Sequence, residues 1–126
     1  MFPLRKAKRV LLLDDDAAIQ RLVSTLLKRA GFRVDTVSRG SKAIEALGAG
    51  KYDAILLDLM MPTEGGVTVV NHLRETNPAL LDRVLLLTST PDSVLKNLQR
   101  GVAGIVRKPF KSEELVAAVT KVAKSS

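Results

Sequence analysis

The chain has 126 residues, of which 46% are hydrophobic and 26% are charged, and its formal net charge is +7 at pH 7. This length and composition are typical of one soluble globular domain with a hydrophobic core. The absence of cysteine excludes a disulfide framework and a thiolate metal site.

The chain starts with a basic segment that contains Arg5, Lys6 and Lys8 and is followed by Arg9. We interpret residues 1–8 as a solvated terminus that could be frayed, rather than as a nucleic-acid surface. Aromatic residues, on which single strands stack, make up only 3% of the chain. The apolar run at 10–13 is too short for a signal peptide, and no other run approaches a membrane span. We therefore expect a cytoplasmic protein without a membrane partner.

Apolar or alternating segments predict five strands, at 9–13, 33–37, 52–57, 83–87 and 104–106. Helical spacing of apolar residues predicts five helices, which include residues 19–30, 43–47, 66–75, 90–98 and 112–124. Gly31 is suited to end the first helix, while Thr90 and Ser112 are suited to cap the fourth and fifth. The alternation of strands and helices predicts a parallel sheet with helices on both faces.

The character of each strand predicts its place in that sheet. The segments 10–13, 54–57 and 84–87 are continuously apolar, as central strands covered on both faces should be. The alternating segment 33–37 and the short segment 104–106 suit the edges. We therefore expect an α/β fold, a doubly wound (βα)5 flavodoxin-like sheet with strand order 2-1-3-4-5, formed by residues 1–126 as a single domain.

Polar groups follow four of the predicted strands and should meet at one edge of the sheet, where ligands bind in such folds. They are Asp14, Asp15 and Asp16 after the first strand, Asp58 after the third, Thr88 after the fourth and Lys108 after the fifth. Several carboxylates so close together require a cation, or some of them stay protonated. Oxygen ligands without His or Cys point to a hard ion such as Mg²⁺. Asp16 is better explained as the N-cap of the first helix.

Four segments, "LLLDDD", "ILLDLMMP", "LLLT" and "KPF", together resemble the response-regulator receiver domain of two-component signalling, the CheY-like family. The resemblance extends over essentially the whole chain. It implies a phosphorelay switch in which Asp58 accepts a phosphoryl group from the phosphohistidine of a sensor histidine kinase or a histidine phosphotransfer protein. Such a domain is a signalling switch that promotes its own phosphotransfer and slow aspartyl-phosphate hydrolysis, and is not an enzyme in the usual sense.

The resemblance also implies roles for the surrounding residues. Asp15, Asp58 and the backbone carbonyl of Met60 would bind Mg²⁺ directly, with Mn²⁺ as an alternative, and Asp14 would act mainly through water. Thr88 would donate to the new phosphoryl oxygen, and Lys108 would pair with it. The peptide bond between Lys108 and Pro109 would be cis. These roles agree with the chemistry, because a carboxylate is a competent nucleophile and phosphoryl transfer depends mainly on positioning and electrostatics.

The chain departs from the family pattern in four places. The segment "TEGG" at 63–66 stands where most receivers have Gly, a variable residue, Asp and Gly, and Ser89 stands for a common Ala. Ile105 replaces the usual aromatic residue, and the span from Thr88 to Lys108 is shorter than usual, so we expect a trimmed fourth helix. Because Ile105 cannot donate a hydrogen bond, switching would have to proceed through packing or loop movement.

Alternative functions remain open at this point. The main one is a pseudo-receiver, an interaction module that works without phosphorylation. A haloacid-dehalogenase-like phosphatase would share the spacing of Asp14 and Asp16, but "AAI" follows here instead of that family's pattern. We interpret His72 as a partly exposed helical residue rather than a relay site. We expect no output domain after the last predicted helix, so the chain is either a single-domain regulator that acts on an unknown output protein or a receiver separated from its effector domain. A homodimer is open, and nucleic-acid binding is not expected of this domain alone.

Overall fold

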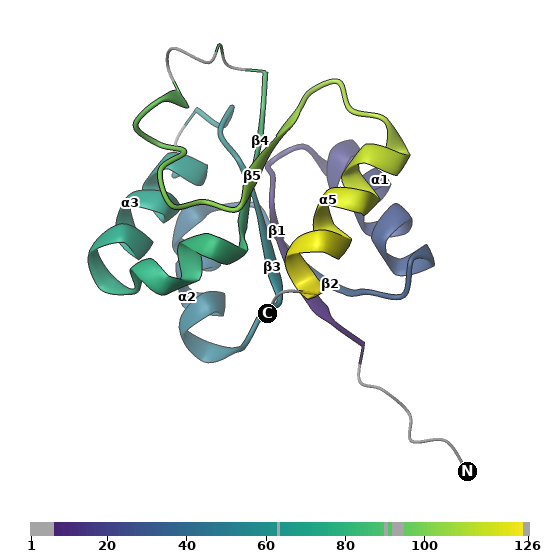
Figure 1. The fold of residues 1–126 in the computed structure, drawn as a ribbon, viewed down its shortest axis with the longest axis horizontal. Coiled ribbons are helices and arrows are strands. Elements are labelled where there is room, and N and C mark those ends of the chain that lie inside the picture. The colour runs from purple at the N-terminus through teal and green to yellow at the C-terminus, as the bar shows by residue number, and fades with distance from the viewer. Residues whose placement is uncertain (1–6, 63, 90, 92–94, 125–126) are drawn as a thin grey trace.

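The computed structural model describes residues 7–62, 64–89, 91 and 95–124, and within them a five-stranded parallel sheet is the central element. The strands are β1 (Arg9–Leu13), β2 (Arg33–Val37), β3 (Ala54–Asp58), β4 (Val84–Thr88) and β5 (Gly104–Arg107). Their spatial order is β2-β1-β3-β4-β5, and all four neighbouring pairs are parallel. The predicted fold and strand order are therefore confirmed (Figure 1).

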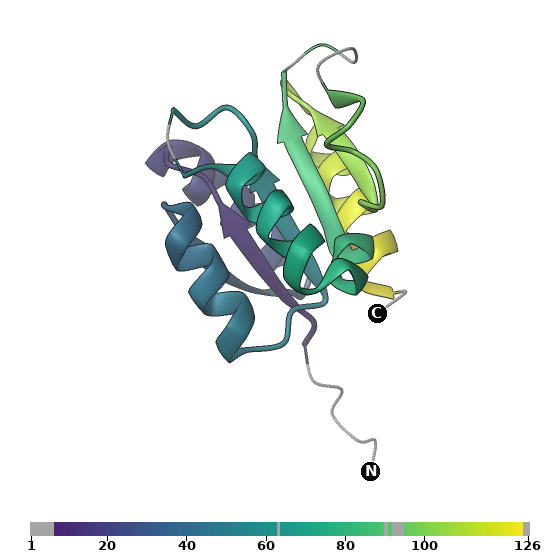
Figure 2. The ribbon, with the colours of Figure 1, turned by 90° about the vertical axis from the view of Figure 1, so that its left-hand side faces the viewer.

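Helices cover both faces of the sheet, as Figures 1 and 2 show. The helices are α1 (Ala17–Arg29), α2 (Gly40–Ala49), α3 (Gly66–Thr76) and α5 (Ser112–Lys124), together with the 3-10 helix η1 (Pro78–Arg83). The pair α1 and α5 packs on one face, and the pair α2 and α3 packs on the other. None of the helices in the described part of the chain is long and apolar enough to cross a membrane.

The local structure departs from the sequence prediction at η1, and part of the prediction lies on residues that the structure does not describe. The helix expected from Thr90 falls largely on residues 90 and 92–94, which lie outside the described residues; beyond them the Gln99 N–H donates to the Leu95 carbonyl oxygen at 2.9 Å. The helix η1 was not predicted, because a 3-10 helix of six residues is too brief to show helical periodicity. Residues 1–6 of the basic terminus also lie outside the described residues.

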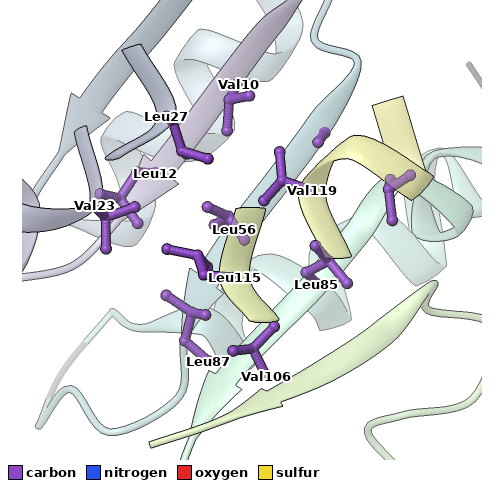
Figure 3. Packing of buried hydrophobic residues seen from close by; sticks show 12 residues of the cluster. Val10, Leu12, Val23, Leu27, Leu56, Leu85, Leu87, Val106, Leu115 and Val119 are labelled. Carbon is purple, nitrogen blue, oxygen red and sulfur yellow. The ribbon is translucent and has the colours of Figure 1, made fainter. Parts of the chain in front are cut away.

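Alternate residues of the central strands enter two separate hydrophobic layers. Val10 and Leu12 of β1 face α1 and α5, whereas Leu11 and Leu13 face α2 and α3. Figure 3 shows the first layer, in which Leu12 and other strand residues meet side chains from the two helices. The central strands β1, β3 and β4 are almost wholly buried and β2 is largely exposed, which confirms the assignment of centre and edge.

An ion-pair cluster joins β1 and β2 near the amino ends of the strands. The Tyr52 hydroxyl donates to Asp35 Oδ2 at 2.8 Å, and Arg9 Nη2 lies 3.1 Å from the same oxygen. The Arg9 guanidinium also stacks 4.7 Å from the centre of the Tyr52 ring. The hydrogen bond from Tyr52, and then the contacts with Arg9, lower the pKa of Asp35. Arg9, which follows the basic segment, is thus held in a network between β1 and β2.

Candidate functional site

The carboxyl ends of the strands bring the predicted polar residues together. Asp14 directly follows β1, Asp58 and Thr88 are the last residues of β3 and β4, and Lys108 directly follows β5. The strand order reverses between β1 and β3, so the groups at these two ends face each other. Carboxylate oxygens of Asp14, Asp15 and Asp58 all lie within 4.8 Å of one another. The predicted acidic cluster therefore exists as a physical site.

Lys108 serves both buried acids as a counter-ion. Its Nζ lies 3.2 Å from Asp58 Oδ1 and 3.6 Å from Asp14 Oδ2. Asp14 and Asp58 are 1% and 3% exposed, whereas Asp15 is exposed. In the described part of the chain the Lys108 ammonium thus pairs with two of the three carboxylates, and the cluster keeps an excess of negative charge that a further cation would relieve.

The environment of Asp14 is unfavourable for its ionised form. Burial is the largest cause that raises the pKa of Asp14, and the charges of Asp58 and Asp15 raise it further. The Asp16 N–H, which donates to Asp14 Oδ1 at 2.9 Å, and the nearby Lys108 act in the opposite direction. Among the described residues, Asp14 Oδ2 is buried without a hydrogen-bond partner. A buried carboxylate oxygen left in this state is suited to a cation or its bound water.

Neighbouring residues hold the acidic strand end in place. Asp16 accepts hydrogen bonds from the N–H groups of Ala18 and Ile19 at 2.8 and 3.3 Å, which confirms it as the N-cap of α1. The Gln20 side-chain amide donates to the Asp14 carbonyl oxygen, and also to the Val37 carbonyl oxygen at 3.3 Å. Sequence reasoning missed Gln20, which looks like an ordinary polar residue of a helix. It joins the end of β1 to the end of β2.

The pocket matches the ligand preferences of Mg²⁺. Its donors are oxygens throughout, with one exposed and two buried carboxylates and a hydroxyl nearby. Mg²⁺ binds through one or two carboxylates and keeps several waters, which suits a pocket that is open on the Asp15 side. The residues therefore fit the metal that the sequence predicts.

Met60 contacts two residues of the pocket, Asp58 and Thr88. The Met60 N–H donates to Asp58 Oδ1 at 2.9 Å, and the Met60 sulfur accepts a weak hydrogen bond from the Thr88 hydroxyl at 3.8 Å. The side chain of Met60 is nevertheless 52% exposed. The contact between Met60 and Thr88 could not be inferred from the sequence, since it depends on how the loops after β3 and β4 meet.

The segment after the phosphoacceptor candidate is attached to α2. Glu64 has a φ of 43°, in the left-handed region, and its carbonyl oxygen accepts the N–H of Gly40. Its carboxylate lies 3.3 Å from Arg39 Nε. These contacts occupy the segment where the sequence departs from the family pattern, and nothing in the local sequence indicated them.

The other residues singled out from the sequence lie around the pocket or on the helices and strands beside it. The Lys108–Pro109 bond is cis, as the resemblance implied. Ile105 is half-buried and packs against the hydrophobic layer that contains Leu86, so its surroundings are apolar. His72 is a partly exposed residue of α3, as predicted. Ser89 and Lys108 line one side of a hollow of about 450 Å³.

A model of the response regulator receiver domain matches residues 10–120. Among curated proteins, the DNA-binding response regulator MtrA of Mycobacterium leprae is 35% identical over 112 residues, which is 89% of this chain and 49% of that protein. The transcriptional regulatory protein GltR of Pseudomonas aeruginosa is 33% identical over 114 residues, or 89% of this chain and 47% of that protein. The chain thus spans about half the length of the curated relatives it matches.

Solved structures support the same assignment. The chemotaxis response regulator CheY4 of Vibrio cholerae has a TM-score of 0.82 and 28% identity, with 93% of this chain and 99% of that chain covered. The response regulator TrrA of Thermotoga maritima, solved in complex with Mg²⁺-BeF, has a TM-score of 0.80 and 29% identity, with 91% and 98% covered. The acidic pocket, the sheet order and these similarities agree with one another.

Proposed function

The chain belongs to the response regulator receiver domain family, and from this premise we propose that Asp58 is its phosphoacceptor and that a phosphohistidine is the donor. A carboxylate oxygen of Asp58 attacks the phosphorus atom, the bond from phosphorus to the histidine nitrogen breaks, and the donor imidazole leaves with its electron pair. The product is an aspartyl phosphate on this chain. An anionic phosphoryl group is repelled by an acidic pocket, so positive charge must neutralise part of this repulsion.

The observation that supports this proposal most directly is the position of Lys108. Its ammonium lies 3.2 Å from Asp58 Oδ1, so it is already beside the atom that would receive the phosphoryl group. As a compact point charge it would remain near the new phosphoryl oxygens. The buried hydroxyl of Thr88, at the end of the neighbouring strand β4, would donate a hydrogen bond to one of them.

We also propose the residues that hold Mg²⁺, with Mn²⁺ as an alternative. Asp15, Asp58 and the Met60 carbonyl would bind the ion directly, while Asp14 would act through water. The closeness of the three carboxylates supports this set, as does Asp14 Oδ2, which is buried and has no hydrogen-bond partner among the described residues. When bound, the ion would neutralise charge on the transferring group.

We infer the partners from the chemistry of the site. A phosphohistidine on a sensor histidine kinase or a phosphotransfer protein is the donor, and residues 1–126 act as one receiver domain in the cytoplasm. The lack of cysteine fits that compartment. Two relatives are named for DNA binding or transcriptional regulation, but we do not expect DNA binding from this domain alone. The output partner would be an effector domain, another protein or a second copy of this chain.

Intact-mass measurement after incubation with acetyl phosphate tests the acceptor. We expect one added phosphoryl group with Mg²⁺, and none without Mg²⁺ or in Asp58→Asn. Asp53→Asn is a matched control, because Asp53 is a partly buried carboxylate that binds the backbone N–H of Arg9 instead of the pocket. An adduct that persists in Asp58→Asn would contradict the assignment.

The same experiment separates the receiver from a pseudo-receiver. Acetyl phosphate is a small donor, so a wild-type chain that stays unmodified would next be incubated with a phosphorylated sensor kinase. No transfer from either donor, with Mg²⁺ bound, would favour an interaction module that works without phosphorylation. Turnover of a generic phosphate ester would instead favour a phosphatase, and we expect none.

A further inference from the structure

The amino end of α2 is capped by the segment that follows the acidic pocket, and not by its own N-cap residue. Arg39 occupies the N-cap position but makes no side-chain capping hydrogen bond. The first N–H groups of a helix have no partner within the helix. Here the N–H of Gly40 donates to the carbonyl oxygen of Glu64. The start of α2 and the loop after β3 therefore share one backbone hydrogen bond.

Gly40 permits this contact because it has no side chain. A Cβ at this position would lie 2.4 Å from the Glu64 carbonyl oxygen and 2.9 Å from its carbonyl carbon. Both are backbone atoms, so they could not move away without moving the loop. Gly40 is also buried, which leaves no direction in which the helix end could simply tilt into solvent. Any larger residue must therefore displace the loop, the helix end or both.

Glu64 is held in an unusual backbone conformation at the same point. Its φ of 43° lies in the left-handed region, which residues with a side chain rarely adopt unless their surroundings impose it. Arg39 Nε lies 3.3 Å from Glu64 Oε2, but both side chains are exposed, at 66% and 39%. An exposed ion pair contributes little. We therefore assign the restraint mainly to the backbone contact with Gly40.

The loop is tightly packed against Asp58 at its other side. A Cβ at Gly66 would lie 2.8 Å from the Asp58 carbonyl oxygen, and a Cβ at Gly65 would lie 2.9 Å from Met61 Cβ. Asp58 Oδ1 in turn accepts the N–H of Met60. A displacement of Glu64 would thus be passed on to the backbone around Asp58, because no space is left to absorb it.

We propose that Gly40 is a positioning residue for the phosphoacceptor site: its N–H and its missing side chain hold the loop after β3 in the conformation that presents the Met60 carbonyl beside Asp58. The inference rests on the proposed function for its metal, but the coupling itself is a property of the free chain. Linkage then requires the reverse effect, in which Mg²⁺ bound at the pocket strengthens the contact between Gly40 and Glu64. Through this contact the pocket would influence α2, a route that does not involve Ile105.

The test compares two glycine-to-alanine variants of one helix. Gly40→Ala creates the clash, whereas Gly48→Ala is the matched control, because Gly48 is exposed and has nothing within 4 Å of the added Cβ. Alanine is the better helix former, so on propensity alone both changes would stabilise α2. If Gly40→Ala alone weakens Mg²⁺ binding, helix propensity cannot be the cause, because propensity would stabilise α2 in both variants.

Two readouts in amide NMR spectra distinguish positioning from a general loss of structure. Without Mg²⁺, we expect Gly40→Ala to shift the Met60 amide resonance and to leave the amides of α5, on the opposite face of the sheet, unchanged. On titration with Mg²⁺, its dissociation constant should rise by about fivefold or more, equivalent to ~1 kcal/mol. Gly48→Ala should bind like the wild type. An unshifted Met60 amide together with an unchanged dissociation constant would overturn the proposal.

Hydrogen exchange in the wild type covers the case in which Gly40→Ala does not fold. We expect saturating Mg²⁺ to slow exchange of the Gly40 amide, while the Gly50 amide, bonded to the Ala46 carbonyl oxygen at the other end of α2, changes less. Equal or absent effects at the two amides would refute the coupling. A wild type that binds no Mg²⁺ would remove the proposed function and this inference together, whereas Mg²⁺ binding without the Gly40 effect would remove only the inference.

Discussion

Replacing Asp14 with Asn should make the metal-free protein more stable. The buried carboxylate faces Asp58 and Asp15 with the Lys108 ammonium beside it, and burial and the charges of the two acids raise the pKa of Asp14. An amide has nearly the same shape and can still accept the Asp16 N–H through its oxygen, so the hydrogen bond to Asp14 Oδ1 has a substitute. The charge is removed while the packing is kept.

The distances between Asp14 and its charged neighbours set the size of the expected gain in stability. Lys108 Nζ at 3.6 Å from Asp14 Oδ2 attracts it by about 5 kcal/mol at an effective dielectric constant of about 20. Each of the other two carboxylates, no more than 4.8 Å away, repels it by at least about 3.5 kcal/mol on the same basis. Because the exposed Asp15 is partly screened, the two repulsions together are about as large as the attraction, and the burial of Asp14, the largest cause of its raised pKa, decides the sign. We therefore expect Asp14→Asn to add roughly 1–3 kcal/mol to the free energy of unfolding.

Urea unfolding at neutral pH with a chelator, followed by circular dichroism, measures this gain. Because the folded-state pKa of Asp14 is raised above its ordinary 3.8, the wild type loses stability as pH rises from that value through the folded pKa. The gain in Asp14→Asn should therefore vanish in acid and grow toward neutral pH. Excess Mg²⁺ should stabilise the wild type more than the variant.

The same substitution at Asp35 supplies a control of opposite sign. The pKa of Asp35 is lowered by the Tyr52 hydroxyl and Arg9, so Asp35→Asn should destabilise the fold, by less than about 1 kcal/mol because the site is exposed. If Asp14→Asn were neutral or destabilising without Mg²⁺, repulsion among the carboxylates would not destabilise the metal-free fold. The metal argument built on that repulsion would then be wrong.

Three further outcomes follow from single contacts. Lys108→Met should lower the rate of phosphorylation by acetyl phosphate and Mg²⁺ by about 10²-fold or more, measured by intact mass against time, and a rate near the wild type would exclude its charge-neutralising role. Tyr52→Phe should lower the free energy of unfolding by about 1 kcal/mol; since the Asp35 pKa is lowered in the folded state, this loss should appear above the ordinary value of 3.8 and fade as pH falls through the folded pKa. Leu12→Ala, which empties a fully buried site, should cost about 2–5 kcal/mol in denaturant unfolding, whereas Leu22→Ala, at a 47% exposed residue, should cost far less, and equal losses would contradict the assigned core.

Much of the fold was predictable because its determinants are local. The continuously apolar segments that contain Leu12 and Leu56 indicated central strands, since a strand covered on both faces has no polar side. The alternating segment around Asp35 indicated an edge. Once the strand order was inferred, the position of Asp58 directly after a strand was enough to expect it beside Asp14.

What the sequence by itself determined is therefore the sheet, its order and the identity of the acidic groups at its carboxyl edge. Only the tertiary structure decided how those groups are held: the division of one lysine between two buried acids, the Met60 sulfur over Thr88, and the carbonyl of Glu64 on the N–H of Gly40. The reason is physical. Strand and helix patterns repeat along the chain within a few residues, whereas these contacts depend on distances between loops that packing of the whole sheet and its helices sets.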